Sequence, residues 1–288
     1  MSELCPISIL IPAKNEISNI RACIESARFA DEIVVVDSNS TDSTQEISIS
    51  LGARVVDFKW NGAFPKKKNW ALANIAWKHP WVFILDADER ITPELAGELR
   101  AIATQPAPAC EGYYVNRRFW FLDGWLMHCG YYPSWNLRFF RHELGRYEQF
   151  TGVGDTQSGD NEVHEHVILN GRSGHLKYEM EHYAFPTISI WIEKHNRYSN
   201  WEARLLRSEE GSASASSASI TPELARKRRI KHFAARLPFR PTLRFFYHYV
   251  WRRGFLDGYR GYVFCRLMAF YEFMNVTKAA ELQRTGTK

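Results

Sequence analysis

The stretch WVFILDADER, residues 81–90, decides how the rest of the chain is interpreted. Five apolar residues, 81–85, run without a break into two carboxylates, Asp86 and Asp88. An uninterrupted apolar run of this length is typical of a strand that is buried on both faces of a sheet. The carboxylates then mark its carboxyl end, which is the edge where open α/β sheets bind ligands. Because two neighbouring carboxylates are costly to leave unpaired, we predict that a divalent cation binds there.

Strands and helices are expected to alternate before this stretch. Apolar runs predict buried strands over residues 7–12 and 31–37 and a short strand over 54–57. Capping and turn residues between them predict helices from about Ser18 to Ala27, from the polar turn at 38–42 to about Leu51, and from 66–69 onward. A further helix is expected after Pro93. This alternation predicts an α/β fold, with a mainly parallel sheet that is flanked by helices.

The composition is that of a globular protein in a reducing compartment. The chain has 288 residues, of which 45% are hydrophobic, and its five scattered cysteines form no Cys-x-x-Cys pair. This pattern argues against a disulfide framework and against a zinc site. The first residues lack the basic and apolar regions of a signal peptide, so we expect none. No segment has the run of at least about 18 apolar residues that a transmembrane helix needs.

Positive charge is concentrated toward the carboxyl terminus. Residues 221–288 hold 15 Lys and Arg against 4 Asp and Glu, whereas residues 1–220 hold 22 against 28. A Ser/Ala-rich segment, 208–220, comes before the basic region and is expected to be a linker. The charge excess predicts an anionic partner. Since nothing in the tail resembles a nucleic-acid-binding motif, we expect a membrane surface and no nucleic acid.

The basic region also has a helical apolar stripe, at positions 243, 246, 247, 250 and 251, which Arg244, Arg252 and Arg253 border. This combination suits a helix that lies in a membrane interface. It equally suits a helical cap that packs on the core with its charges in water. A second amphipathic segment is expected from about residue 262 to 274, so the sequence predicts a C-terminal amphipathic helical extension.

Three segments resemble the nucleotide-binding motifs of family 2 glycosyltransferases, in the same order and spacing. They are ILIPAKNE (9–16), VVDSNSTD (35–42) and LDAD (85–88). Later segments resemble the branch that contains lipopolysaccharide-core β-glucosyltransferases. They are WNLRFF (135–140), VHE (163–165), His182 and GFLDG (254–258).

The resemblance implies a GT-A fold, a UDP-sugar donor, a divalent Mg²⁺ or Mn²⁺ ion, and inversion at the anomeric carbon. Carried onto this chain, it implies that Asp37 meets the uracil, while Asp86 and Asp88 serve the ribose and the metal. The predicted donor-nucleotide residues are Pro12, Asn15, Glu16, Asp37, Ser40, Lys68 and Asp86. The predicted metal ligands are Asp88, Asp86 and His182.

Inverting transfer needs a carboxylate that deprotonates the acceptor hydroxyl. Glu165 falls where the family has its base motif, although this chain has Val-His-Glu in place of the more common Glu-Asp pair. Glu162 is the alternative base. The predicted acceptor-binding residues are Arg138, Trp135 and Trp125, since sugar faces stack on aromatic rings and Arg binds phosphate.

Together these expectations describe an inverting glycosyltransferase that moves a sugar, glucose by resemblance, from a UDP-sugar to a lipid-linked or lipopolysaccharide-core acceptor in cell-envelope polysaccharide synthesis. We expect it to be cytoplasmic and peripheral on the inner face of the cytoplasmic membrane. The alternatives are a phosphohydrolase with Asp86 as nucleophile and Asp88 as acid, and a non-catalytic nucleotide-binding or membrane-surface protein. The predicted division is a catalytic domain 1–207, with a nucleotide-binding half 1–100 and an acceptor-binding half 101–207, then the linker 208–220 and the basic membrane-associating region 221–288.

Overall fold

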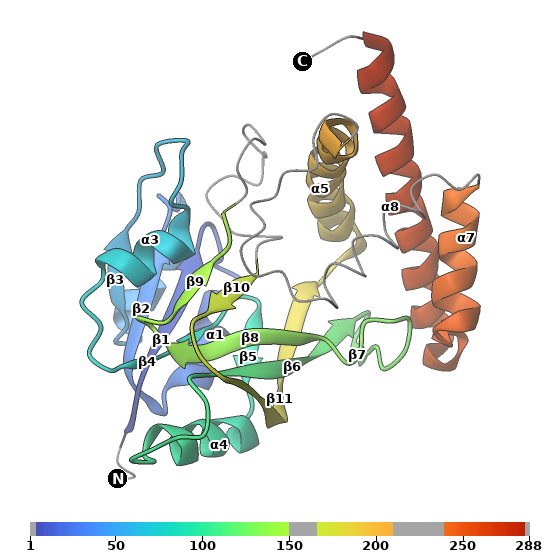
Figure 1. Cartoon of the computed structure of the whole chain (residues 1–288). Helices are drawn as coiled ribbons and strands as arrows, with labels where there is room; N and C mark the ends of the chain where they lie inside the picture. Colours follow the sequence, from blue (N-terminus) through green and yellow to red (C-terminus); the bar gives the residue numbers. More distant parts are fainter. Residues whose placement is uncertain (1–3, 150–165, 210–238, 286–288) are drawn as a thin grey trace. The chain divides into compact units, whose positions relative to one another are not determined.

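The computed structural model describes residues 4–149, 166–209 and 239–285 (Figure 1). They form two compact units. The first unit comprises the described parts of Met1–Trp120, Tyr132–Gln149 and Gly159–Ala184, and the second comprises those of Phe121–Tyr131 and Phe185–Lys288. The predicted functional division at residues 207 and 220 stays a prediction, and most of the predicted linker lies outside the described residues.

The first unit begins with alternating strands and helices, as predicted. Four parallel strands lie in the order β3-β2-β1-β4, and three crossover helices connect them. Because the strands are parallel, their carboxyl ends meet at one edge of the sheet. The strands are β1 (Cys5–Ala13), β2 (Ala30–Asp37), β3 (Arg54–Asp57) and β4 (Trp81–Ile84), and the helices are α1 (Ile20–Ala27), α2 (Thr44–Ser50) and α3 (Lys67–Asn74).

Hydrophobic packing covers both faces of this parallel sheet. Ile9 of β1 belongs to a buried cluster with residues of α1 and of α4 (Pro93–Ala103). Its neighbour Leu10 belongs to a second buried cluster, which contains residues of α3. Since successive side chains of a strand point to opposite faces, strands covered on both sides need apolar residues at every position. This packing explains the uninterrupted apolar runs in the sequence.

The sheet continues with antiparallel strands, so the sheet expected to be mainly parallel is mixed. Its order runs on from β4 as β8-β6-β11-β5, and β8 is antiparallel to both β4 and β6. The aromatic stretch 112–147, expected as short strands and loops, includes two long strands of this part. The strands are β5 (Glu89–Ile91), β6 (Gly112–Phe121), β8 (Trp135–Arg141) and β11 (Ser173–Phe185), while β9 (Gly145–Tyr147) and β10 (Val167–Leu169) form a separate antiparallel pair.

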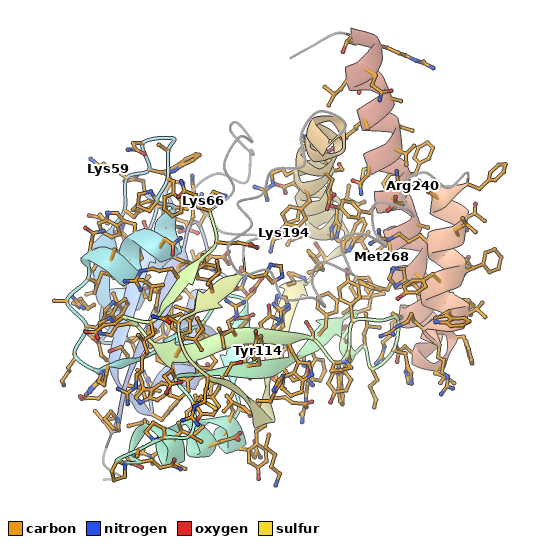
Figure 2. The ribbon with its side chains drawn as sticks, viewed as in Figure 1. Lys59, Lys66, Tyr114, Lys194, Arg240 and Met268 are labelled. Atoms are coloured by element: carbon orange, nitrogen blue, oxygen red, sulfur yellow. The ribbon has the colours of Figure 1, made fainter. Side chains whose placement is uncertain are left out.

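The second unit is mainly helical. Figure 2 shows Arg240 at the start of α7 and Met268 on α8, the helix that packs beside it. Both predicted C-terminal helical segments are present, and the later one is longer than the predicted 262–274. Among the described residues, no helix is long and apolar enough to cross a bilayer. The elements are β7 (Gly124–Trp125), α5 (Ile188–Glu209), α7 (Arg240–Phe246), the π-helical η1 (Tyr247–Trp251), the 3₁₀-helical η2 (Gly254–Asp257) and α8 (Gly258–Thr285).

The GFLDG motif holds the second unit together at the start of α8. A Cβ atom on Gly254 would lie 2.8 Å from Sγ of Cys265 and 2.9 Å from Sγ of Cys129, so only glycine fits there. The carboxylate of Asp257 accepts hydrogen bonds from the backbone N–H of His128 and from its ring Nδ1, each at 2.9 Å. The motif therefore fixes the loop around residues 127–129 against α8.

Candidate functional site

The loops that follow β1 and β2 are joined by hydrogen bonds at the carboxyl edge of the sheet. The backbone N–H of Asn15 donates to Oγ of Ser40 at 2.8 Å, and the side-chain oxygen of Asn15 accepts from the N–H of Thr41 at 2.8 Å. The N–H of Glu16 donates to Oγ1 of Thr44 at 2.9 Å. Asn15 adopts a left-handed backbone, with φ of 55°, which Asn tolerates better than most residues. Asn15, Glu16 and Ser40, predicted at the donor site, are thus brought together.

Asp37 ends β2 and is fully buried beneath this loop pair. One of its carboxylate oxygens accepts from the backbone N–H of Ser40 and from the amide of Gln45, both at 2.8 Å. Its strand partner is Ala13, and Pro12 is paired with Val36 in the same register. The other oxygen accepts from the hydroxyl of Ser40 at 2.5 Å, so the orientation of the carboxylate is fixed at both oxygens. Each carboxylate oxygen has more than one acceptor site, so Asp37 keeps further acceptor capacity.

Asp86 follows β4 and is held between two cations. Lys68 Nζ lies 2.9 Å from one carboxylate oxygen, and an Nη of Arg138 lies 2.6 Å from the other. Burial alone raises the pKa of Asp86, but the charges and hydrogen bonds of Arg138 and Lys68 outweigh burial and hold its pKa well below the usual range. Asp86 is therefore ionised at neutral pH.

Glu89 completes this buried network, and sequence reasoning did not identify it. Its side chain is fully buried, with Arg138 at 2.9 Å and Arg117 at 3.3 Å from one oxygen. The other oxygen accepts the backbone N–H of Asp86 at 2.9 Å. Glu89 thus shapes the turn that carries Asp86 and Asp88. The only sequence signal was its position directly after the Asp-x-Asp pair.

The environment of Arg138 differs from that expected for an acceptor-binding residue. It was predicted to bind the acceptor, yet it is 5% exposed and is paired with both Asp86 and Glu89. It reaches them because β8 lies antiparallel beside β4. In this structure its guanidinium orders the acidic turn, and its role toward the acceptor stays a prediction.

Strand pairing places His182 beside Asp88. In the antiparallel pair β5–β11, His182 is opposite Glu89, and the N–H of Tyr183 donates to the backbone oxygen of Asp88 at 2.8 Å. Nε2 of His182 lies 3.6 Å from Oδ1 of Asp88. An imidazole and a carboxylate oxygen at this separation can share one divalent cation. Within the described residues, no group of three or more His, Cys, Asp or Glu suits a metal.

The predicted bases and one neighbouring histidine lie outside the described residues. They are Glu162, Glu165 and His164. His166 is described, is exposed, and has Nδ1 3.0 Å from an oxygen of Glu148. The base assignment therefore stays a prediction.

The two aromatic residues predicted to bind the acceptor fall in different units. Trp135 belongs to the first unit, is 41% exposed, and has its ring 4.8 Å from that of His175. Trp125 is half-buried in β7 of the second unit. Their role also stays a prediction.

The fold is similar to that of a known sugar-transferring enzyme. The structure of the mannosyltransferase PcManGT from Pyrobaculum calidifontis, in complex with GDP-Man and Mn²⁺, matches this chain with a TM-score of 0.51 at 13% sequence identity. The match covers 97% of this chain and 88% of that one. At this identity the likeness shows the fold alone, which is the GT-A fold.

Sequence comparison then gives the family. The model of "Glycosyl transferase family 2" matches residues 8–162. The lipopolysaccharide core biosynthesis glycosyltransferase LpsC of Rhizobium meliloti (strain 1021) is 31% identical, over 69% of this chain and 70% of its own length. An uncharacterized glycosyltransferase of Rickettsia bellii (strain RML369-C) is 28% identical over 98% of this chain and 89% of its own length. The chain belongs to glycosyltransferase family 2.

Proposed function

We propose that this glycosyltransferase transfers a hexosyl group, glucose, from UDP-glucose to a lipid-linked or lipopolysaccharide-core acceptor, with inversion at the anomeric carbon. The observation that carries the proposal is the pairing of Asp88 with His182 at 3.6 Å, at the sheet edge that also carries Asp37. The similarity to LpsC supports an acceptor of the lipopolysaccharide-core class. An enzyme with such an acceptor would act at the inner face of the cytoplasmic membrane.

The donor nucleotide would lie across the carboxyl edge of the parallel strands. Asp37 would accept the N–H of the uracil ring, because its carboxylate is already oriented by Ser40 and Gln45. Pro12 and the loop 15–16 would line the nucleoside pocket, and Asp86 would meet the ribose. Lys68, whose Nζ lies 2.9 Å from Asp86, would bind a phosphate of the donor.

Asp88 and His182 fit a Mg²⁺ or Mn²⁺ ion, because they offer one oxygen and one nitrogen ligand at a distance that a single cation can bridge. When bound, the ion would neutralise the leaving diphosphate. The predicted third ligand, Asp86, has both oxygens paired with Lys68 and Arg138, so it would serve better as a hydrogen-bond acceptor.

In the transfer, the acceptor oxygen would attack the anomeric carbon as the bond from that carbon to the diphosphate oxygen breaks. Glu165 would take the hydroxyl proton, and Glu162 is the alternative base. The phosphohydrolase alternative is less favoured, because its nucleophile would be Asp86, whose carboxylate is held by two cations.

Titration calorimetry tests the donor site. The purified protein is titrated with UDP in Mn²⁺, with UDP in EDTA, and with GDP in Mn²⁺. We expect binding of UDP that is lost in EDTA and weaker binding of GDP. Tighter binding of GDP than of UDP would refute uracil as the nucleobase of the donor. UDP binding that is unchanged by EDTA would refute the proposed metal ion. Absence of all nucleotide binding would refute the proposed donor.

A further inference from the structure

The helical hairpin of the second unit exposes a large amount of aromatic surface between residues 239 and 273. Phe239, Trp251 and Tyr259 are 80%, 79% and 78% exposed, respectively. Isolated exposed apolar residues are ordinary on a protein surface, but a concentration of large ones marks an interaction site. The other exposed large apolar residues here are Leu243, Phe246, Tyr247, Val250, Phe255, Leu256, Tyr262, Phe270 and Phe273.

These side chains lie on helix faces that turn away from the interior of the unit. On α7 and η1, the exposed positions 243, 246, 247, 250 and 251 follow helical spacing, and α7 has no buried residue. On α8, the exposed positions 259, 262, 270 and 273 alternate with a buried stripe that includes Phe264, Met268 and Tyr271.

Aromatic contacts connect the faces of the two helices. The ring of Tyr262 on α8 lies 5.9 Å from that of Tyr249 and 6.2 Å from that of Phe245. Tyr249 also lies 6.3 Å from Phe255 of η2. These contacts hold η1 and η2 against the start of α8, and we call the exposed large apolar residues of α7, η1, η2 and α8 together the aromatic face.

The arginines of this segment fall into two groups with different roles. Arg240 and Arg244 are paired with the buried carboxylate of Glu272 at 2.5 and 2.6 Å, so their charge holds α7 to α8. Across the described residues, four other arginines of the hairpin have no carboxylate within salt-bridge distance. They are Arg252, Arg253, Arg260 and Arg266.

No acidic side chain of the hairpin offsets these four charges at the surface. Between residues 239 and 273 the only acids are Asp257 and Glu272. Both are nearly buried, with side chains 5% and 7% exposed, and both are already bound, by His128 and by the paired arginines. Within the described residues, the aromatic face thus combines apolar rings with arginines that no acid of the hairpin neutralises, and this combination is complementary to an anionic surface.

We propose that the aromatic face docks on an anionic lipid bilayer, with α7, η1 and the start of α8 lying along its surface. Trp and Tyr have apolar rings with one polar end and are favoured at the depth of the headgroups. Arginines at the same level bind the lipid phosphates. This inference deepens the proposed function, on which its biological purpose rests, since a lipid-linked acceptor is presented at such a surface. Bilayer binding itself requires neither donor nor acceptor.

The ion pairs of the structure also indicate which arginines of the basic region would contact the bilayer. In the sequence, Arg244, Arg252 and Arg253 all border one apolar stripe and could not be distinguished. The ion pairs separate them, because Arg244 stabilises the helix pair while Arg252 and Arg253 remain available to lipid phosphates.

Vesicle sedimentation of the full chain tests the proposal. The vesicles contain either phosphatidylcholine alone or an equal mixture with phosphatidylglycerol. We expect preferential binding to the anionic vesicles. Substitution of Trp251→Ser with Tyr259→Ser should weaken binding by at least about tenfold, through loss of two interfacial rings. Substitution of Arg253→Gln with Arg266→Gln should weaken it by about ten- to thirtyfold on anionic vesicles.

Matched controls carry the same chemical changes elsewhere on the chain. Ile49→Ser with Phe64→Ser removes two exposed apolar side chains of the first unit, and Arg21→Gln with Arg197→Gln removes two exposed charges. Both should bind vesicles as the parent chain does. Circular dichroism confirms folding, and UDP calorimetry without vesicles reports the donor site separately from bilayer binding.

Three outcomes would overturn the proposal. The parent chain could fail to bind anionic vesicles, or the face variants could bind no worse than their controls. Alternatively, the chain could dimerise without vesicles and lose the dimer on Trp251→Ser with Tyr259→Ser, which would make the aromatic face an interface between copies. Loss of donor binding in the parent chain would instead refute the proposed function.

Discussion

Replacement of Arg138 by methionine would test whether the buried charge network holds the acidic turn. One Nη of Arg138 lies 2.6 Å from Asp86 and 2.9 Å from Glu89, so the change removes the cation that both carboxylates share. Asp86 would keep Lys68 at 2.9 Å, and Glu89 would keep Arg117 at 3.3 Å. The methionine fills much of the space of the arginine stem, so the effect is mainly electrostatic.

The expected loss of stability follows from the burial and the remaining partners of the two carboxylates. Removal of one partner from a buried ion pair typically costs about 3–5 kcal/mol. Because the side chain of Asp86 is 29% exposed and each carboxylate retains one cation, we expect the lower end, about 3 kcal/mol near neutral pH.

The free energy of unfolding that the substitution removes should become smaller as the pH falls. In the parent chain, the pKa of Asp86 is held below that of the unfolded chain, so its stabilisation is present above about pH 4 and is lost as the pH falls through the folded-state value. In the variant the carboxylates are less well paired and can protonate more easily. The difference between the parent and the variant should therefore shrink by about 1 kcal/mol between pH 8 and pH 3.

Urea unfolding, followed by circular dichroism at both pH values, measures this difference. Arg141→Met is the matched control, because Arg141 lies on the same strand and its guanidinium sits 5.1 Å from the ring of Trp81. Loss of that cation–π contact should cost about 0.5–1 kcal/mol. Equal costs for the two variants, or a cost for Arg138→Met that does not change with pH, would refute the proposed role of the network.

Three further predictions concern the donor site, the base and the second unit. Asp88→Asn should abolish Mn²⁺-dependent UDP binding in calorimetry while the fold is kept; unchanged affinity would exclude Asp88 as the metal ligand. Glu165→Gln should leave UDP binding intact and lower the rate of transfer by about 10²- to 10⁴-fold; if only the control Glu162→Gln is inactive, Glu162 is the base. Burial lowers the pKa of both His195 and His248 to about 4, so both are neutral in the folded chain. Their stabilisation is complete above about pH 6.5 and is lost as the pH falls toward 4, about 2 kcal/mol for each by pH 5. Replacement of either by glutamine should flatten the acid limb of the stability curve in urea unfolding, and an unchanged limb would contradict this account.

The amino-terminal half of the fold was predictable because its signals are local. The apolar runs at 7–12, 31–37 and 81–85 indicated buried parallel strands, and parallel strands bring their carboxyl ends to one edge by geometry alone. The common edge for Asp37 and Asp86 therefore followed from the order of strands and helices. The antiparallel half was harder to predict, since the aromatic stretch 112–147 has no clear alternation, and its strands are defined by partners far along the chain.

The family, the α/β architecture and the acidic edge of the sheet could be inferred before the structure was known, because they depend on residue order and on the period of the apolar pattern. The side chains that meet at this edge could be identified only from the folded chain. The β5–β11 pairing brings His182 to Asp88, and the β4–β8 pairing brings Arg138 to Asp86. Which arginines of the carboxyl-terminal hairpin pair with Glu272 was decided in the same way. Ion pairs and ligand sets depend on distances of a few ångströms between distant segments, and no local pattern in the chain encodes those distances.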